Sequence, residues 1–564
     1  KDGYKITLDG GADFSWNSTT YELSPGSSSR TLESGIQVEG EMELYNVVIQ
    51  NIRGSNENGG AINITGSNTG PVTLSKSKIT KCTSELGSAI MMQGRYLVTL
   101  SDSEVSYCNS GGGTTNNSGG AIRTYGSVVS SLLLQNVDFL YNYAQRRVGF
   151  NNTLPSDGNG GALFWNARGT EETKCTIDGC KFLYNKSDDN GGAIKSQGTM
   201  EFVGGQTEIA YNTAPVGAGL YIEGYTGGST VSGERTINYS LNDKMYIHDN
   251  NAPYYDYDGS FYPGKGAGVH LFFGDQMTLE MGSTINLQLS GARIENNISQ
   301  GYGDEYPSQG GGIYFENTSL SSKGYKFNIS LNYGSVLTNK ASNGAGVYVY
   351  KGEVGSENIN NNTLNISNNI SSLNGGGIYI EEGSLAMANG SINNNNITGS
   401  GHGGGIYIEN GDFTIEAGQL VGNSVSSGMG AGVYIVGSGT LGNFTMKGGE
   451  IKNNTASNNN GGGVYVNGGN FTLYQGAITG NISSGDGGGV YVNGGNFILN
   501  HSMGSISTNK AVNGGGVFLN NGNFDLVVGK ITGNITSGLG GGVYLKGEDC
   551  IYQLKEGQIE DSEA

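Results

Sequence analysis

The chain has 564 residues, of which 101 are Gly and only 7 are Pro, and its formal net charge is −19. That charge repels phosphate backbones and anionic lipid surfaces, so the composition argues against a nucleic-acid partner. The charged fraction of 14% and the 33 Tyr residues argue against a disordered chain, because disordered segments carry many charges and few aromatic side chains. No apolar run reaches about 18 residues, so the sequence predicts no helical membrane span.

Short Gly-Gly blocks followed by Val, Ile or Leu recur along the chain. They place one residue of the same expected strand at sixteen equivalent positions: Asn63, Met91, Arg123, Phe164, Lys195, Tyr221, His270, Tyr314, Tyr348, Tyr379, Tyr407, Tyr434, Tyr465, Tyr491, Phe518 and Tyr544. In the last third of the chain one unit spans about 26 residues. A period between about 20 and 50 residues is typical of stacked repeat units.

One such unit holds three short stretches in which apolar residues alternate with others, at 464–466, 471–473 and 477–479. Three short strands joined by tight turns describe one coil of a parallel β-helix, in which each strand pairs with its equivalent in the next coil. The pattern predicts an all-β solenoid of about 16 or more coils, with residues 1–39 as the N-terminal cap and first strands and 40–564 as one continuous β-helix. Longer corner loops are expected within about 143–310, and regular coils of 26–31 residues within about 340–546.

A second periodic position lies about three residues after the third strand of each unit. It holds Asn51, Asn142, Asn185, Asn212, Asn250, Asn297, Asn339, Asn369, Asn395, Asn423, Asn454, Asn481, Asn509 and Asn534. Stacked asparagines can hydrogen-bond from amide to amide along the solenoid and satisfy the backbone of the turn. The sequence therefore predicts a structural asparagine ladder at this corner, and not a catalytic site.

The same alignment places Cys82 and Cys108 at the ladder position in consecutive coils. Directly stacked residues are close enough for a disulfide, so we favour a bridge here over two free buried thiols, which implies an oxidising compartment. Cys175 and Cys180 flank one strand and its turn, where a local bridge is also compatible with the spacing. Cys550 has no predicted partner.

Two short motifs resemble a known family. The blocks Gly59-Gly60-Ala61-Ile62 and Gly191-Gly192-Ala193-Ile194 have the form GGA[ILV], and Phe139-Leu140-Tyr141-Asn142 and Phe182-Leu183-Tyr184-Asn185 have the form FxxN. Together they resemble the repeats of polymorphic outer-membrane proteins of the chlamydial type, and the later GGGVYVN units are similar to glycine-rich repeats of many surface proteins. That resemblance implies a secreted, right-handed, single-stranded parallel β-helix that serves as an adhesin passenger.

Strand alternation predicts that Val464 and Val466 point into the core while Tyr465 points outward. The equivalent tyrosines would then form an outward stripe, which either stabilises neighbouring coils or presents an aromatic face to sugars or to another solenoid. A recurring Glu follows the stripe at Glu223, Glu316, Glu381 and Glu409. We expect a solvated acidic edge there, with a catalytic or Ca²⁺-binding pair at Glu381 and Glu409 as the alternative.

Insertions leave from the corner after the Asn position and are the predicted binding surface, because long loops on a rigid scaffold often carry function. Their aromatic and acidic side chains suit carbohydrate or protein contact, and Asp256-x-Asp258-Gly259 resembles a fragment of a Ca²⁺ loop, so Ca²⁺ is the one possible cofactor. The candidate binding residues are Tyr254, Tyr255, Asp256, Tyr257, Asp258, Phe261, Tyr262, Tyr302, Asp304, Glu305 and Tyr306.

If the source is a eukaryote, Asn-x-Ser/Thr sequons predict glycosylation at exposed turns, with candidates at Asn17, Asn63, Asn238, Asn297, Asn443, Asn470, Asn481 and Asn534. We predict a non-catalytic extracellular or cell-surface protein for adhesion or for carbohydrate or protein binding. The alternatives are a homopolymeric subunit of an extracellular filament and a β-helical polysaccharide lyase or glycoside hydrolase. The expected partners are a glycan or protein on a host or neighbouring cell, or further copies of the chain.

Overall fold

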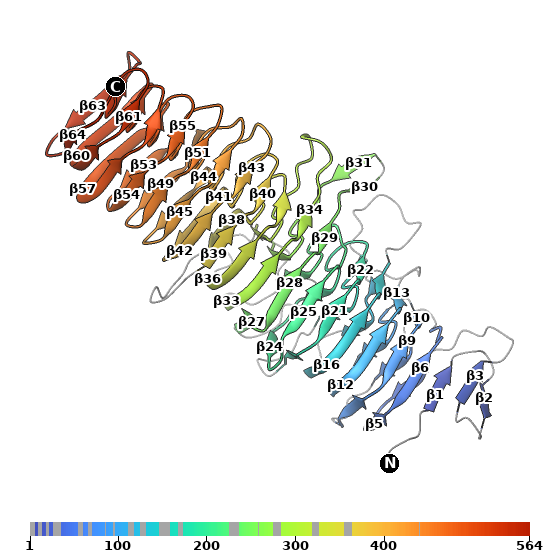
Figure 1. Ribbon diagram of the computed structural model, residues 1–564. Coiled ribbons are helices and arrows are strands. Elements are labelled where there is room, and N and C mark those ends of the chain that lie inside the picture. Colours follow the sequence, from blue (N-terminus) through green and yellow to red (C-terminus); the bar gives the residue numbers. More distant parts are fainter. Residues whose placement is uncertain are drawn as a thin grey trace. The chain divides into compact units, whose positions relative to one another are not determined.

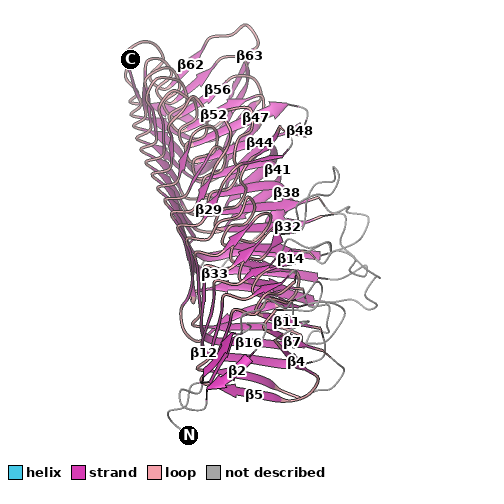
Figure 2. Cartoon of the chain, turned by 90° about the vertical axis from the view of Figure 1, so that its right-hand side faces the viewer, coloured by secondary structure: helices cyan, strands magenta, loops and turns pink. Residues whose placement is uncertain are grey.

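The structure is a computed structural model that describes most of the chain as strands and turns (Figure 1). None of the described residues is helical, as Figure 2 shows, so the described part contains no helix that could cross a membrane. The described residues are 35–54, 60–65, 70–84, 86–93, 96–110, 118–124, 131–145, 158–166, 173–224, 236–257, 259–274, 284–318, 326–354, 364–438 and 440–564, together with the strands at 6–9, 14–17 and 22–25.

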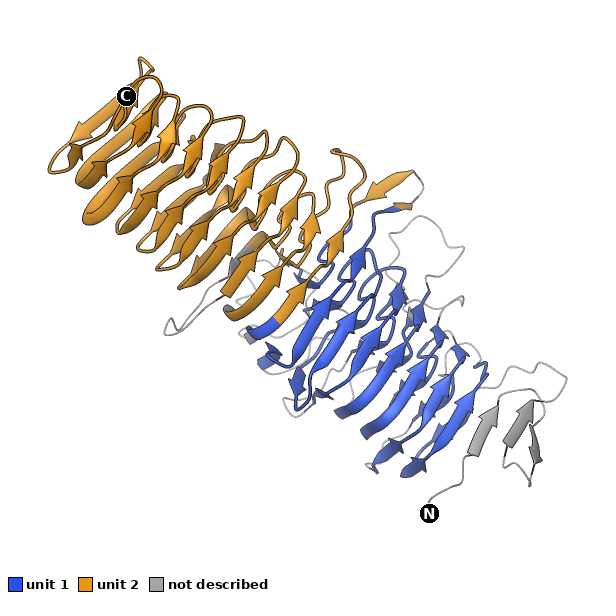
Figure 3. Cartoon of the chain, viewed as in Figure 1, with its two compact units in different colours: residues 1–255, 264–292, 319–327 blue, residues 256–263, 293–318, 328–564 orange. Residues whose placement is uncertain are grey.

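The chain divides into two compact units, coloured separately in Figure 3. Unit 1 comprises residues 1–255, 264–292 and 319–327, and unit 2 comprises residues 256–263, 293–318 and 328–564. Both are built as parallel β-solenoids of the right-handed type, with about 15 turns in total. The predicted fold class is therefore confirmed, and each unit is described by itself below.

Unit 1 stacks strands on three faces and at one corner. The first face holds β4 (Ile36–Val38), β7 (Ile62–Ile64), β11 (Ile90–Met92), β15 (Ile122–Thr124), β19 (Leu163–Trp165), β23 (Ile194–Ser196), β26 (Leu220–Glu223) and β32 (Val269–Phe273). The second holds β5 (Met42–Tyr45), β8 (Val72–Ser75), β12 (Leu97–Ser106), β16 (Ser131–Leu140), β20 (Cys175–Asp178), β24 (Met200–Val203), β27 (Thr236–Asn242) and β33 (Thr284–Glu295).

The third face of unit 1 contains the ends of β12 and β16 and five further strands. These are β6 (Val47–Gln50), β9 (Lys78–Thr80), β21 (Lys181–Leu183), β25 (Thr207–Ala210) and β28 (Met245–His248). Two-residue strands mark the corner: β10 (Thr83–Ser84), β13 (Asn109–Ser110), β17 (Tyr143–Ala144), β22 (Lys186–Ser187) and β29 (Asn251–Ala252). The remaining strands are β1 (Ile6–Asp9), β2 (Phe14–Asn17), β3 (Glu22–Pro25), β14 (Ser118–Gly119) and β18 (Gly158–Asn159).

Unit 2 repeats the same plan. Its first face holds β35 (Ile313–Asn317), β38 (Val347–Val354), β41 (Ile378–Met387), β44 (Ile406–Ile415), β47 (Val433–Ser438), β52 (Val464–Asn467), β56 (Val490–Val492), β59 (Val517–Leu519) and β62 (Val543–Leu545). The ends of β41 and β44 continue onto the second face, which also holds β49 (Asn443–Met446), β53 (Asn470–Leu473), β57 (Asn496–Ser507), β60 (Gly522–Thr532) and β63 (Cys550–Leu554). The hairpin strand β48 (Thr440–Leu441) pairs antiparallel with β47.

The third face of unit 2 includes the ends of β57 and β60. Its other strands are β36 (Lys326–Leu337), β39 (Leu364–Ser367), β42 (Gly390–Asn393), β45 (Gln419–Val421), β50 (Glu450–Lys452), β54 (Gly476–Thr479) and β64 (Gln558–Glu560). The corner holds β34 (Ile298–Ser299), β37 (Lys340–Ala341), β40 (Ile370–Ser371), β43 (Asn396–Ile397), β46 (Ser424–Val425), β51 (Thr455–Ala456), β55 (Ile482–Ser483), β58 (Lys510–Ala511) and β61 (Ile535–Thr536). The strands β30 (Tyr255–Tyr257) and β31 (Ser260–Tyr262) pair with each other.

Register explains the sequence repeat directly. Equivalent residues pair across coils, so that Val464 lies opposite Val490 and Tyr465 lies opposite Tyr491. Within one coil the inward positions Val464, Val466, Phe471, Leu473 and Ile478 are fully buried and fill the core. Because hydrogen bonds run between repeats, each coil needs a neighbour to complete both its sheets and its core.

The tyrosine stripe stacks between neighbouring coils as one of its two interpretations predicted, but the alternative of an open aromatic face is wrong. Tyr465 does lie on the opposite side of its strand from the core, but it is only 5% exposed. The corner glycines fold back over it: Gly461 has φ +72°, and a Cβ placed on it would lie 2.8 Å from Tyr465 Cβ. Alternation fixes which side of a sheet a side chain takes, and a glycine-rich corner then covers that side.

Candidate functional site

The covered rings form a continuous stack in unit 2, buried except for half-buried Tyr407 and Tyr544, which we call the tyrosine column. It consists of Tyr314, Tyr348, Tyr379, Tyr407, Tyr434, Tyr465, Tyr491, Phe518 and Tyr544. Ring centroids of successive members lie 4.7–5.3 Å apart. Such offset-stacked pairs contribute about 0.5–1.5 kcal/mol each beyond their buried area. The column stabilises the stack of coils, and its buried members, such as Tyr314, Tyr348 and Tyr465, present little surface to a ligand.

The acidic row beside this column is tied to it. Tyr348 donates a hydrogen bond to Glu381 Oε2, and Tyr379 donates one to Glu409 Oε2. Burial raises the pKa of Tyr348 and Tyr379 far above the usual range, and the neighbouring carboxylates add to the shift. Glu381 and Glu409 thus accept hydrogen bonds from buried phenols, an arrangement that supports a structural role for this pair.

In unit 1 the position equivalent to the column holds cations between rings. The guanidinium of Arg123 lies 5.4 Å from the ring centroid of Phe164, and Lys195 Nζ lies 5.5 Å from Phe164 and 5.1 Å from Tyr221. Lys195 also forms an ion pair of 2.9 Å with Glu223. The side chains of Arg123 and Lys195 are buried. Inside unit 1 the aromatic rings stabilise both charges, and Glu223 compensates that of Lys195.

The asparagines at the corner form hydrogen-bonded ladders in each unit. From Asn142 to Asn250 and from Asn297 to Asn534, Nδ2 of each Asn donates to Oδ1 of the next at 2.9–3.1 Å. The backbone N–H of the same Asn donates to that oxygen as well, and a second Nδ2 hydrogen bond reaches a backbone carbonyl. Asn51 is one residue out of register, because Arg53 pairs with Thr83 and so places Ile52 opposite Cys82.

Cys82 and Cys108 occupy the ladder position in unit 1, as the alignment predicted, but both are free thiols in the structure. Each Sγ instead donates to a backbone carbonyl, Cys82 to Thr80 at 3.3 Å and Cys108 to Ser106 at 3.4 Å. Cys175, Cys180 and Cys550 are free thiols as well, so neither predicted bridge is formed.

The ladder also bears on the sequons. Asn297, Asn481 and Asn534 are fully buried ladder residues, and Asn63 is nearly so. In the folded chain their amide nitrogens cannot carry a glycan, which corrects the expectation that these sequons lie at exposed turns. Asn443 and Asn470 are half-buried and Asn238 is exposed, whereas the side chain of Asn17 lies outside the described residues.

The predicted binding loops come together in part. In unit 2 the ring of Phe261 stacks on that of Tyr302, with centroids 3.9 Å apart and planes at 2°, and Tyr306 lies 5.8 Å from Phe261 at a tilt of 53°. Tyr302 and Tyr306 face each other across a tight turn through Gly303, with a backbone hydrogen bond of 3.1 Å. We call these three rings the loop cluster.

The loop cluster is open to solvent. Tyr302 is 44% exposed and Tyr306 is 36% exposed, and Asp304 and Glu305 stand exposed at the tip of the same turn. Charges and aromatic faces are therefore adjacent on one small surface of unit 2. Tyr262 is half-buried on β31 of the same unit.

Other predicted loop residues are placed differently. Tyr254 and Tyr255 belong to unit 1, whereas the loop cluster belongs to unit 2. Asp256 Oδ1 accepts a hydrogen bond of 2.9 Å from the N–H of Gly259, which closes a local turn. Asp258 and the side chain of Tyr257 lie outside the described residues, so the Ca²⁺ site stays a prediction.

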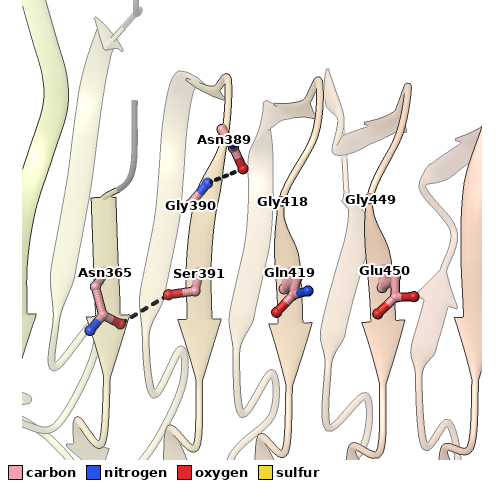
Figure 4. A pocket seen from close by; sticks show the side chains of 8 residues that line it. All are labelled: Asn365, Asn389, Gly390, Ser391, Gly418, Gln419, Gly449 and Glu450. Atoms are coloured by element: carbon pink, nitrogen blue, oxygen red, sulfur yellow. Dashed lines mark hydrogen bonds between the residues drawn. The ribbon is translucent and has the colours of Figure 1, made fainter. Parts of the chain in front are cut away.

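A groove on the third face of unit 2 was not predicted. It has a volume of about 470 Å³, and Figure 4 shows the polar side chains that line it: Asn365, Ser391, Gln419 and Glu450, one on each of β39, β42, β45 and β50, beside Asn389, Gly390, Gly418 and Gly449. Ser391 Oγ donates to Asn365 Oδ1 at 3.0 Å. A Gly two residues before Ile or Leu, as in Gly449-Glu450-Ile451, recurs in three of its coils and is a sequence signal of the close stacking beside the groove.

The glycines of this groove have a structural cause. A Cβ on Gly449 would lie 2.1 Å from the carbonyl oxygen of Gly418, and one on Gly418 would lie 2.8 Å from that of Gly390. Gly418 also has φ +143°, a conformation that other residues rarely adopt. The groove follows from close stacking of coils, and only its polar row is free to serve a ligand.

Comparison of the chain with protein-family models, with curated protein sequences and with solved structures gives no match.

Proposed function

We propose that the protein is a non-catalytic extracellular surface protein that binds carbohydrate or protein through the loop cluster of unit 2. The observation that carries the proposal is the parallel stack of half-buried Phe261 on exposed Tyr302, completed by exposed Tyr306. None of the three rings belongs to the buried core. Exposed aromatic groups of this kind are typical of binding surfaces.

Pre-stacked rings suit recognition for an energetic reason. Their mutual contact restricts side-chain rotation before a ligand arrives, so less conformational entropy is lost on binding. Tyr side chains add hydroxyl groups at the edge of an apolar face, and Asp304 and Glu305 provide acceptors for the hydroxyls of a sugar or for basic groups of a protein.

The groove of unit 2 favours carbohydrate as the ligand class. Its row of amide, hydroxyl and carboxylate groups offers donors and acceptors at the steady interval of the coils. A volume of about 470 Å³ falls within the usual range of ligand sites. An uncharged or basic glycan fits this row, because its one ionisable group is a carboxylate.

A glycan array and a panel of cell-surface proteins, probed with the purified chain, test the proposal. Replacing both rings in Tyr302→Ala/Tyr306→Ala is expected to weaken binding by about tenfold or more, because anchoring aromatic groups dominate interfaces. Tyr474→Ala is the matched control, since Tyr474 is an exposed tyrosine of the same unit that lies apart from the loops. Equal binding by the double variant and the control would contradict the proposal.

A further inference from the structure

Four exposed tyrosines form a stack on unit 1 that neither the loop cluster nor the groove includes. Tyr107, Tyr141, Tyr184 and Tyr211 lie in consecutive coils, and successive ring centroids are 5.1, 4.9 and 5.0 Å apart with planes within 10°. They are 53%, 46%, 45% and 44% exposed. We call this row the tyrosine ridge.

The backbone of the ridge is unfavourable for tyrosine. Each of the four residues has a positive φ between 53° and 58°, because each immediately precedes the ladder residue of its coil. Placing a residue with a Cβ in this left-handed conformation costs roughly 1–2 kcal/mol. In unit 2 the equivalent positions, also at positive φ, carry side chains that are all smaller than tyrosine. They are Asn296, Thr338, Asn368, Asn394, Gly422, Asn453, Gly480, Thr508, Gly533 and Asp561.

Stacking alone does not account for the exposed position. The tyrosine column of unit 2 shows that this fold covers stacked tyrosines with a glycine corner when they stabilise the coils. The ridge has the same ring spacing and no such cover. A row of bulky rings that is costly for the backbone and open to solvent is typical of a surface that contacts a ligand.

Ring geometry restricts the class of ligand. Parallel rings with centroids near 5 Å are offset, since touching atoms approach to about 3.5–4.0 Å, so part of each ring face remains open. Side chains on one face of an extended peptide repeat at about 6.8 Å, which does not match the ridge. The step from ring to ring is close to the advance of one pyranose unit in an extended glycan.

The charges beside the ridge favour a neutral ligand. Three residues before each ridge tyrosine lie Glu104, Asp138, Lys181 and Glu208, and Lys78 precedes them in the same row. Lys78 is already paired with Glu104 at 2.8 Å. The mixed signs match neither a polyanion nor a polycation, and the net charge of −19 opposes association with a second copy of this chain.

We propose that the tyrosine ridge of unit 1 is a binding site for an uncharged, extended polysaccharide, with one sugar unit over each ring. The apolar C–H faces of the sugars lie on the open parts of the ring faces, and the four phenol hydroxyls bond the sugar hydroxyls. This site shares no residue with the loop cluster, and it does not depend on the function proposed above.

Binding of two neutral hexasaccharides, cellohexaose and N-acetylchitohexaose, to the full chain by calorimetry tests the site, with an anionic oligogalacturonate as a comparison. Tyr141→Asn/Tyr184→Asn removes two rings and keeps a backbone that the fold accepts, since Asn occupies this position in unit 2. We expect about tenfold weaker binding of a neutral hexasaccharide, an unchanged circular-dichroism spectrum and no binding of the oligogalacturonate. Tyr141→Phe/Tyr184→Phe keeps the rings and is expected to retain most of the affinity.

Tyr302→Ala/Tyr306→Ala separates this proposal from the function proposed above. It should leave the part of hexasaccharide binding that depends on Tyr141 and Tyr184 unchanged, because it alters no residue of the ridge. Failure of the wild-type chain to bind either hexasaccharide, or equal affinity in the Asn variant, would overturn the ridge site whatever the loop variant does. A dimer in analytical ultracentrifugation that the Asn variant abolishes would also overturn it and assign the ridge to self-association.

Discussion

The asparagine ladder makes a strong quantitative prediction at Asn481. This residue is fully buried, and its side chain takes part in four hydrogen bonds. Nδ2 donates to the carbonyl of Ile451 at 2.9 Å and to Asn509 Oδ1 at 2.9 Å. Oδ1 accepts from the backbone N–H of Asn454 at 3.0 Å and from its Nδ2 at 2.9 Å.

Asn481→Ala removes all four bonds and leaves the buried N–H of Asn454 without its acceptor. A hydrogen bond contributes about 0.5–1.5 kcal/mol net, and an unsatisfied buried group costs about 1–3 kcal/mol. The expected loss is about 4 kcal/mol of local stability. Because each coil of a solenoid contacts only its neighbours, the loss should remain local to the adjacent coils.

Hydrogen exchange followed by mass spectrometry is the suitable assay. Peptides that cover β50 to β58 should lose about a thousandfold in protection, the factor that corresponds to about 4 kcal/mol. Peptides from unit 1 should exchange at unchanged rates. Asn470→Ala is the control, since Asn470 also lies in an amide ladder, with bonds of 2.8 Å to Asn443 and 2.6 Å to Asn496, but is only half-buried.

Water can replace the lost partners at Asn470, so its variant should reduce protection by no more than about tenfold. Equal effects of the two substitutions would refute the reasoning, because the ladder would then contribute through chain geometry and not through satisfaction of buried groups.

Gly463→Ala should destabilise unit 2 by about 1–3 kcal/mol, because the new Cβ would lie 2.5 Å from the carbonyl oxygen of Gly489. In Gly494→Ala no atom lies closer than 3.9 Å to the new Cβ, so this variant should lose only the smaller free energy of placing a residue with a Cβ at positive φ. Urea titration compares the two variants. Alkali should unfold unit 2 progressively. Burial raises the pKa of Tyr491 from 10.0 to about 12, so the folded state holds this proton more tightly than the unfolded state does. The associated stability is lost as the pH rises from 10 to about 12, which absorbance titration beside circular dichroism can show. A thiol reagent should react quickly with one cysteine of the native chain, the half-buried Cys550. After denaturation without reductant it should react with all five cysteines. Reaction of only three cysteines after denaturation would instead establish one disulfide.

The fold could be predicted because each coil needs glycine at the same positions of its backbone, which gives the sequence its period. Gly461 has a positive φ where the corner covers Tyr465, and a Cβ on Gly463 would collide with the carbonyl oxygen of Gly489 in the next coil. Glycine therefore recurs wherever coils turn or touch. Strands pair only with equivalent strands, and the repeat therefore carries the register as well.

Burial at the surface could not be predicted in the same way. The side of the strand chosen by Tyr465 follows from alternation, but its cover depends on how the glycine corner folds back, and the alternation pattern does not contain that information. The sequons at Asn481 and Asn534 mislead for a related reason, since the same residues serve the ladder. The loop cluster was found because Phe261 and Tyr302 lie in insertions, where no core requirement explains aromatic residues.

The two tyrosine stacks together show where selection beyond folding acts. The column position accepts Tyr465 in unit 2 and Lys195 and Met91 in unit 1, so under the glycine corner the fold accepts side chains of different chemistry. At the corner itself the fold accepts Asn, Gly, Thr, Asp or Lys at positive φ, and tyrosine at Tyr141 and Tyr184 satisfies no backbone need. Where the fold would accept a small residue and the chain carries an exposed ring, the reason lies outside the fold, and a ligand that lies along the coils supplies it.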